Sequence, residues 1–413
     1  MQNLFYNPAA IITVNTKGQN LKRGKNMNDI GVLKGYSVLT ENGVIKEIIR
    51  SEDAGNIPAD KITDLTGKLL LPGLIDCHTH LVFAGSRANE FAMRIKGNSY
   101  EKIAEAGGGI ISTVKALRNT SPEELILLAR PKIDNLIKQG VTTLEIKSGY
   151  GLDFDNEIKM LHVIKILNEE YPIDIIPTFL GAHTIPPEFK SDRSGYIKLI
   201  TDKMLPYIVK NELARFCDAF CESTAFSARE TKVILEAASE INLDTKLHTD
   251  QFNQIGGIDV ALSVGSASVD HLEVMSNSDI SKFSEVSTVC TLLPGVSFFL
   301  DYSYAPARKL IENNAIVSIA TDFNPGSSHI CSLHLIMSLA AIKLKMTPEE
   351  IISAVTINAA KALLVSNLTG SIETGKKADF SVFDTGDYTE IVYNIGQNLC
   401  VMTVKDGEII YEN

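Results

Sequence analysis

Histidines cluster at particular points of this sequence. The chain has eight in 413 residues, and five lie at or just beyond the end of a short apolar run that predicts a β-strand: His78, His80, His183, His248 and His271. Only one residue separates His78 from His80, so in a strand both imidazoles point to the same side. Imidazole is a common ligand of zinc and iron. The pair indicates a metal site; the alternative is two polar residues that leave a strand for a loop.

A carboxylate can complete this ligand set. Asp322 follows residues 319–321, the end of the eighth β-rich run, where its alternative role is the N-cap of a helix. With His78, His80 and His248 it gives three nitrogens and one oxygen, which suits zinc or ferrous iron with one position left for water. His183 and His271 would face the same region, as further ligands or as substrate contacts. We favour substrate contacts, because four residues already satisfy one ion.

Such side chains meet only if the strand ends lie together. Eight β-rich runs alternate with amphipathic helical stretches, at residues 69–76, 141–147, 173–181, 215–222, 245–250, 267–272, 287–292 and 315–321. Parallel neighbours need crossover connections of this kind. Eight strands also close a (β/α)8 barrel, an α/β fold whose active site lies at the carboxyl ends of its strands. The pattern predicts this barrel, and an open doubly wound sheet is the structural alternative.

The two ends of the chain have a different pattern. Residues 10–14 and 44–49, and later 380–384, 399–405 and 408–411, are short alternating segments. Turn signals occur at Asn42-Gly43 and Asp406-Gly407. These segments predict one small β-sandwich-like domain assembled from both termini. The expected division is therefore 1–66 and 370–413 for the small domain and 67–369 for the barrel.

Composition narrows the classes of function. Acidic residues outnumber basic ones by 50 to 39, giving a net charge of −11. This argues against nucleic acid or an anionic membrane as partner, but not against a small anionic substrate. There is no apolar run of 18 residues, no secretory signal pattern and no Cys-x-x-Cys pair among six cysteines. We therefore expect a cytoplasmic protein.

Longer motifs carry a family resemblance. Residues 72–80, a histidine on each of predicted strands 5 and 6, the strand-8 aspartate and residues 370–380 resemble the amidohydrolase superfamily. More narrowly, the chain resembles the imidazolonepropionase family of histidine breakdown. The segments that carry this narrower resemblance are 83–87, 107–110, 145–152, 179–183 and 321–327.

The resemblance implies a metal centre. It implies one divalent or trivalent ion per chain, zinc or iron, held by His78, His80, His248 and Asp322. Superfamily members with two metals usually bridge them with a carboxylated lysine from strand 4. Here the predicted fourth strand ends at Glu222 with no lysine, and Lys147 lies on the predicted second strand. One metal rather than two is therefore expected.

The resemblance also implies a reaction: hydrolysis of the ring amide of 4-imidazolone-5-propanoate to N-formimidoyl-L-glutamate, by a homodimer. Asp322 would move the proton of the attacking water, and His271 would stabilise the oxyanion. The implied substrate-binding residues are Arg87, Tyr150, His183, Asn324, Gly326 and Ser327. Arg87 would pair with the substrate carboxylate. Tyr100 is a further candidate, and Gly107 to Gly109 predict a lid over the barrel mouth.

One residue departs from the family pattern. Many relatives carry His-x-x-Glu on strand 5, whereas this chain has His248-Thr249-Asp250-Gln251. Gln251 can bind the substrate ring but cannot transfer a proton. Two alternatives remain open: a metal-dependent deaminase of a purine-like or pyrimidine-like ring, and a non-catalytic interaction protein on the same scaffold. Deaminases normally use that glutamate, and an interaction protein would be expected to lack metal ligands.

Overall fold

A computed structural model describes residues 1–55, 57–97 and 108–413, so Tyr100 and Gly107 lie outside the described residues. Its centre is a parallel sheet of eight strands in which each strand pairs with the next along the chain. The strands are β8 (Leu74–Asp76), β9 (Val141–Lys147), β10 (Asp174–Ala182), β11 (Phe216–Cys221), β12 (Asp244–Thr249), β13 (Ser268–His271), β14 (Val289–Leu292) and β15 (Ile316–Ile319).

The sheet closes just beyond the carboxyl ends of its first and last strands. Thr79, after β8, forms a parallel bridge with Phe323, after β15. Two backbone hydrogen bonds flank it, from Asp322 to His78 and from His80 to Phe323, each 3.0 Å long. The predicted (β/α)8 barrel is confirmed. Its closure fixes His78, His80 and Asp322 side by side.

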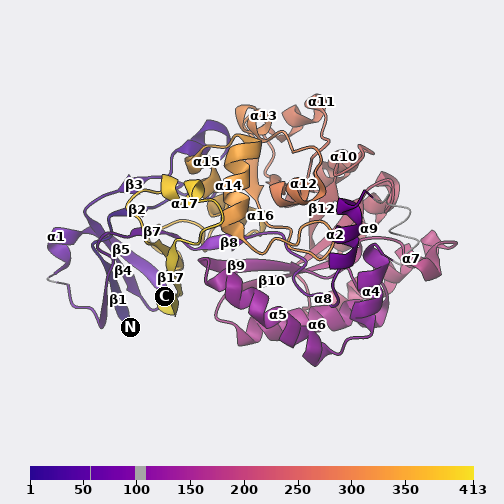
Figure 1. Cartoon of the computed structure of the whole chain (residues 1–413), viewed down its shortest axis with the longest axis horizontal. Helices are drawn as coiled ribbons and strands as arrows, with labels where there is room; N and C mark the ends of the chain where they lie inside the picture. The colour runs from indigo at the N-terminus through magenta and orange to yellow at the C-terminus, as the bar shows by residue number, and fades with distance from the viewer. Residues whose placement is uncertain (56, 98–107) are drawn as a thin grey trace.

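Helices cover the outside of the barrel (Figure 1). The principal ones are α4 (Ile110–Arg118), α5 (Pro122–Ile137), α6 (Phe154–Glu170), α7 (Arg193–Leu199), α8 (Leu205–Lys210), α9 (Ala228–Glu240), α10 (Gly257–Ser263), α11 (Asn277–Ile280), α13 (Ala307–Glu312), α14 (Leu333–Leu344), α15 (Pro348–Ala354) and α16 (Ile357–Ala362). Two more helices, α2 (Ala88–Ile95) and α12 (Pro294–Leu300), follow β8 and β14. Ser227 and Thr347 form capping boxes at α9 and α15, which fix where these helices begin.

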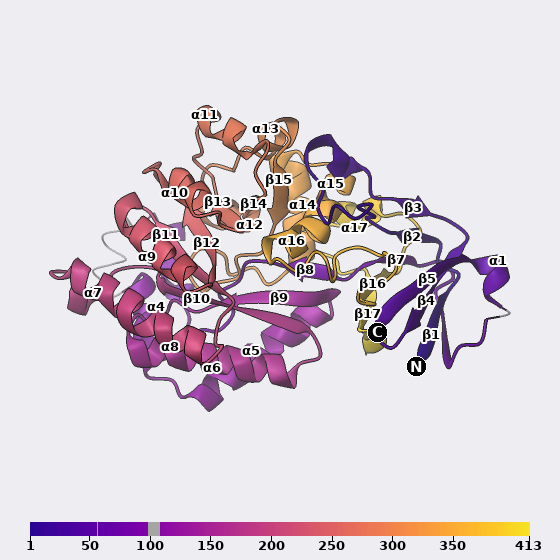
Figure 2. The same ribbon diagram turned by 180° about the vertical axis from the view of Figure 1, so that it is seen from behind.

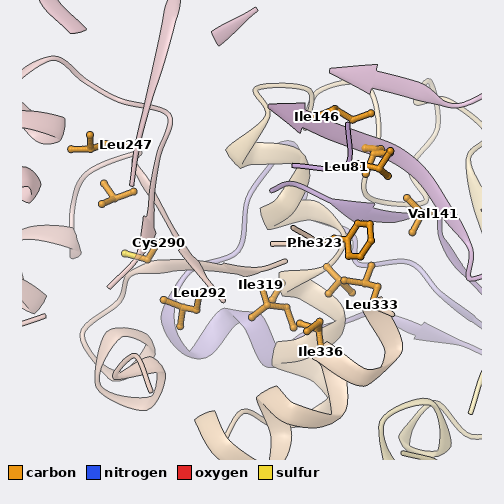
Figure 3. Packing of buried hydrophobic residues seen from close by; sticks show 14 of the residues in the cluster. Leu81, Val141, Ile146, Leu247, Cys290, Leu292, Ile319, Phe323, Leu333 and Ile336 are labelled. Carbon is orange, nitrogen blue, oxygen red and sulfur yellow. The ribbon is translucent and has the colours of Figure 1, made fainter. Parts of the chain in front are cut away.

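Apolar side chains fill the space between the strands and these helices. Figure 3 shows Leu333 and Ile336 of α14 facing Ile319 of β15 and Phe323 beyond it. All four side chains are almost completely buried. Burial of this kind stabilises by about 25 cal/mol per Å² of apolar surface. The packing therefore holds the segment after β15, which carries Asp322, in a fixed position.

The two chain termini build two further sheets at one end of the barrel (Figure 2). One contains, in spatial order, β5 (Val44–Arg50), β4 (Tyr36–Glu41), β1 (Gln2–Tyr6) and β6 (Lys61–Asp64). The other contains β18 (Glu408–Glu412), β17 (Cys400–Lys405), β16 (Phe380–Phe383), β7 (Leu69–Pro72), β2 (Ala10–Ile12) and β3 (Val32–Leu33). Phe5 and Phe380 pack edge to face between the sheets, with ring centroids 5.2 Å apart.

The structure divides the predicted first barrel strand, residues 69–76, into two strands. β7 pairs with β2 and β16 in the terminal sheet, and only β8 joins the barrel. Gly73 lies between them, where a Cβ atom would come within 2.1 Å of the Thr142 hydroxyl. The absence of a side chain lets the backbone pass closely from one sheet to the other. The chain therefore passes from the terminal sheet to the barrel at Gly73, later than the expected boundary between residues 66 and 67.

The described ranges contain no helix that is both long enough and apolar enough to cross a membrane.

Candidate metal centre and substrate cavity

The proposed metal ligands converge at the barrel mouth. Asp322 Oδ1 lies 3.3 Å from His78 Nε2 and 3.4 Å from His80 Nε2. His248, on β12, places its Nε2 3.4 Å from His80 Nε2. All four side chains are buried. The structure therefore brings together nitrogens and an oxygen from three strand ends that are far apart in the sequence.

This donor set fits a metal ion. Among the described residues, His78 Nε2 and Asp322 Oδ1 are buried and make no hydrogen bond. Buried polar atoms are normally paired, because an unpaired one costs about 1–3 kcal/mol. Within the described chain, His78, His80 and Asp322 form one group of potential ligands, and His78, His248 and His271 form another. Two imidazoles and a carboxylate aimed at one point suit zinc or iron.

Carboxylates hold two of these imidazoles from behind. Asp270 Oδ2 lies 2.6 Å from His78 Nδ1, and Asp218 Oδ2 lies 2.9 Å from His248 Nδ1. An ionised carboxylate only accepts, so the hydrogen bond between His78 and Asp270 puts the hydrogen of that ring on Nδ1 and leaves Nε2 bare. The Asp218 carboxylate favours the same tautomer of His248 by its proximity to Nδ1. Burial opposes ionisation of Asp270, but Lys246 and His78 hold its pKa well below the usual range.

A buried ion network supports these two carboxylates. Lys147 Nζ lies 2.8 Å from Asp218 and 3.7 Å from Asp270. Lys246 Nζ lies 2.9 Å from Glu145, which also binds Lys147 at 3.0 Å. All of these side chains are fully buried. Lys147 is thus committed to ion pairs beneath the site, and β11, the fourth barrel strand, contains no lysine.

Sequence reasoning missed Asp218, Asp270 and Lys246 in this network. Each is an ionisable residue inside a buried barrel strand, β11, β13 and β12 respectively. Charged residues are almost never fully buried unless they are paired. That signal could have shown that partners exist. It could not have shown which partners, because those depend on how the strands close into a barrel.

A cavity of about 420 Å³ opens over the donor set. Seven of the substrate contacts expected from the sequence line it: Arg87, Tyr150, His183, Gln251, Asn324, Gly326 and Ser327. His80, His248, His271 and Asp322 line it as well. Asp250, next to Gln251, is buried but is not among the lining residues. The cavity is large enough for a small-molecule substrate.

Two guanidinium groups line the cavity. Arg87 Nη2 lies 2.8 Å from Glu90 Oε2, and its Nη1 occupies the space that a Cβ atom on Gly326 would fill, at 2.0 Å. Arg94, which sequence reasoning missed, donates to the Gly326 carbonyl at 3.2 Å. With one carboxylate and two guanidinium groups, this part of the cavity suits a substrate anion. Glycine at position 326 is what allows Arg87 to approach.

Asn324 shapes the turn more than it faces the cavity. Its Oδ1 accepts from the backbone nitrogens of Gly326 and Ser327, at 2.7 Å each. Its Nδ2 donates to the Asp322 carbonyl and to the Ser327 hydroxyl. Both ends of the amide are therefore already bonded within the turn. This favours backbone groups and Ser327 over the Asn324 side chain as polar contacts.

His183 is neutral where it lines the cavity. Burial, reinforced by the nearby His80, lowers the pKa of His183 to about 3. Its Nδ1 lies 3.0 Å from the Gly149 carbonyl, which can only accept. The hydrogen therefore sits on Nδ1, and Nε2 is left as an acceptor. Tyr150 lies beside it, with ring centroids 5.5 Å apart, and burial raises the pKa of that hydroxyl so that it remains a donor.

The match to protein-family models gives the Amidohydrolase family over residues 69–410. Among curated proteins, the chain is 45% identical to the imidazolonepropionase of Geobacillus thermodenitrificans, over 93% of this chain and 92% of that protein. It is 42% identical to that of Shouchella clausii, over 100% and 94%, and 41% identical to that of Bacillus cereus, over 100% and 97%.

Solved structures with the same fold include Escherichia coli guanine deaminase, at TM-score 0.76 and 14% identity, covering 100% of this chain and 99% of that one. Another is an adenosine deaminase from Xanthomonas campestris with bound zinc, at TM-score 0.75 and 16% identity, covering 99% and 93%. At these identities the likeness shows the fold alone.

Proposed function

Since the chain belongs to the imidazolonepropionase family of the amidohydrolases, we propose that it hydrolyses the ring amide of 4-imidazolone-5-propanoate to N-formimidoyl-L-glutamate. The observation that best supports this proposal is that the convergent His–Asp cluster and Arg87 lie at the same cavity. A cyclic amide with a carboxylate tail needs both of these groups. We also propose that the protein is a cytoplasmic homodimer.

The proposed metal ligands are His78, His80, His248 and Asp322, with one zinc or iron ion per chain. A bound ion of this kind lowers the pKa of water to about 7 and polarises a carbonyl group. Asp218 and Asp270 keep the hydrogens of His248 and His78 on Nδ1, so that both rings present Nε2 as a ligand atom.

This chain's own groups bind the tail and move the proton. Arg87 pairs with the propionate carboxylate, and Arg94 adds a second positive charge. Tyr150, His183 and Gln251 hydrogen-bond the ring, together with the turn at Gly326 and Ser327. Asp322 takes a proton from the attacking water and returns it to the ring nitrogen that leaves. His271 faces the reacting atoms from β13.

The direct test follows the ultraviolet absorbance of 4-imidazolone-5-propanoate with purified protein, and identifies the product by mass spectrometry. We expect rapid loss of substrate with N-formimidoyl-L-glutamate as the product. Asp322→Asn should remove the activity, whereas Asp259→Asn, on the exposed face of α10, should keep it. Release of ammonia from purine or pyrimidine rings, without imidazolone hydrolysis, would replace this proposal with the deaminase alternative.

A further inference from the structure

His271 is held by a carboxylate that neither the motifs nor the ligand set assigns. Its Nδ1 lies 3.2 Å from Oε1 of Glu273, only two residues further along the chain. Glu273 is buried, with 1% of its side chain exposed. The arrangement repeats what Asp270 and Asp218 do for His78 and His248. His271 is thus the third buried histidine at the barrel mouth with a carboxylate at Nδ1, and like His248 it lines the cavity.

An unusual backbone conformation creates this contact. His271 has a φ of 87° and Leu272 a φ of 71°, both in the left-handed region that residues other than glycine rarely adopt. The Leu272 nitrogen donates to the Thr249 carbonyl at 3.2 Å, which ties the turn to the end of β12. Strain of this kind persists where surrounding structure imposes it, and it clusters at functional sites. Here the two left-handed residues bring the Glu273 carboxylate back to the imidazole ring of His271, two residues earlier in the chain.

The other oxygen of Glu273 faces a buried polar neighbourhood. Glu273 Oε2 and the Tyr302 hydroxyl are both buried and make no hydrogen bond with any described residue. Burial, with the negative charge of Glu273, raises the pKa of Tyr302, so its hydroxyl remains a donor beside that carboxylate. No lysine or arginine of the described residues forms an ion pair with Glu273. Among the described residues, the His271 ring is the partner that Glu273 Oε1 meets at hydrogen-bond distance.

We propose that Glu273 is a positioning residue that fixes His271 with its hydrogen on Nδ1 and a bare Nε2 facing the cavity. There Nε2 accepts a hydrogen bond from the attacking water and orients it towards the substrate carbonyl. Asp322 takes the other hydrogen of that water. A neutral ring with a bare Nε2 cannot donate to an oxyanion, so this role replaces the one expected for His271 from the sequence. The inference rests on the proposed function for the identity of the substrate.

The position of the hydrogen can be observed without substrate. Nitrogen-15 NMR of zinc-loaded, histidine-labelled protein separates ring nitrogens that carry a hydrogen from those that do not. His271→Gln identifies the His271 signals. We expect a protonated Nδ1 and a bare Nε2 in the wild-type protein, and a mixture of both forms in Glu273→Gln. A hydrogen on Nε2 in the wild-type protein overturns the proposal, even if the variant fails to fold.

Kinetics supply the second readout. Glu273→Gln keeps the shape of the side chain and should lower kcat by about 100-fold, the lower end of what a general acid–base group contributes. KM should change by less than about threefold, because the substrate contacts remain. Glu350→Gln is the matched control, since Glu350 is also buried but pairs with Arg308 on the far helices α13 and α15. It should keep kcat.

The outcomes are distinct. Glu273→Gln with wild-type kcat and a wild-type His271 spectrum overturns the positioning role. A wild-type protein that does not hydrolyse 4-imidazolone-5-propanoate overturns the proposed function, while the spectrum of the wild-type protein still decides which nitrogen Glu273 fixes.

Discussion

In the proposed function, recognition of the substrate carboxylate depends on Arg87, which lines the cavity. We predict that Arg87→Ala raises KM by about tenfold or more, because hydrogen bonds to charged groups contribute about 1.5–3 kcal/mol each. The Glu90 carboxylate, now 2.8 Å from Arg87, would also lose its partner and repel the substrate. Steady-state kinetics measure this. An equal rise in KM for an analogue without the carboxylate would instead assign Arg87 a structural role.

Arg193→Ala is the matched control for that variant. Arg193 also pairs with a glutamate, Glu230 at 2.6 Å, but it lies on α7 and does not line the cavity. Its loss should leave KM unchanged.

Gln251 is the residue at which this chain departs from the expected His-x-x-Glu pattern. It lines the cavity, and its amide offers a donor and an acceptor but no proton-transfer group. If Asp322 moves the proton alone, Gln251→Glu should keep kcat within about tenfold near pH 7, because proton transfer contributes about 100-fold or more where a residue performs it. Gln251→Ala should mainly raise KM, by the equivalent of about 1 kcal/mol.

A pH–rate profile of the three forms checks this prediction. A rise in kcat of about 100-fold or more in Gln251→Glu, with a new acidic limb, would mean that position 251 is meant to transfer protons. The wild-type protein would then be a poor imidazolonepropionase.

At the scale of single residues, the sequence could indicate which side chains reach the cavity but not what holds them. His78, His80, His248 and Asp322 stand at strand ends, which meet in any parallel barrel. The Glu273 contact depends on two left-handed residues that no spacing rule predicts. The sequence could not show that Arg94 reaches the cavity, because this contact depends on where α2 packs against the barrel.

At the scale of elements, a buried network of ion pairs links several barrel strands to one another. Lys147 of β9 links Asp218 of β11 to Asp270 of β13 across the barrel interior. We predict that Lys147→Met lowers the free energy of unfolding by about 3–5 kcal/mol, because it leaves buried carboxylates without a counter-charge. Chemical denaturation at neutral pH measures this loss.

Lys282→Met controls for the loss of a lysine ion pair in solvent. Lys282 pairs with Asp259, whose side chain is 70% exposed, so its removal should cost less than about 1 kcal/mol. A cost for Lys147→Met as small as that for Lys282→Met would contradict a structural role for the network.

Element positions were largely predictable, because hydrophobic runs and helix caps are local signals. The exception is the run at residues 69–76, which the structure divides between β7 and β8. Its apolar residues suit either sheet equally well. Only contact with β2 and β16, from opposite ends of the chain, decides where β7 belongs.

At the scale of the whole molecule, the chain begins in the terminal sheets, passes through the barrel and ends in one of the same sheets. β16 and β17, from the end of the sequence, lie in one sheet with β2 and β7 from its beginning (Figures 1 and 2). This arrangement was predictable in outline, since both ends carry short alternating segments. It leaves the opposite face of the barrel, where the strands end in His248 and Asp322, open to a substrate.

The central claim is that one metal ion at this face carries the hydrolysis. Metal-free protein is titrated with zinc while the loss of 4-imidazolone-5-propanoate is followed. Activity should be absent without metal, rise in proportion to added zinc and stop rising at about one equivalent per chain, because one ion satisfies a three-nitrogen, one-oxygen set. Full activity in the metal-free protein, or a rise that continues to two equivalents, would contradict the account.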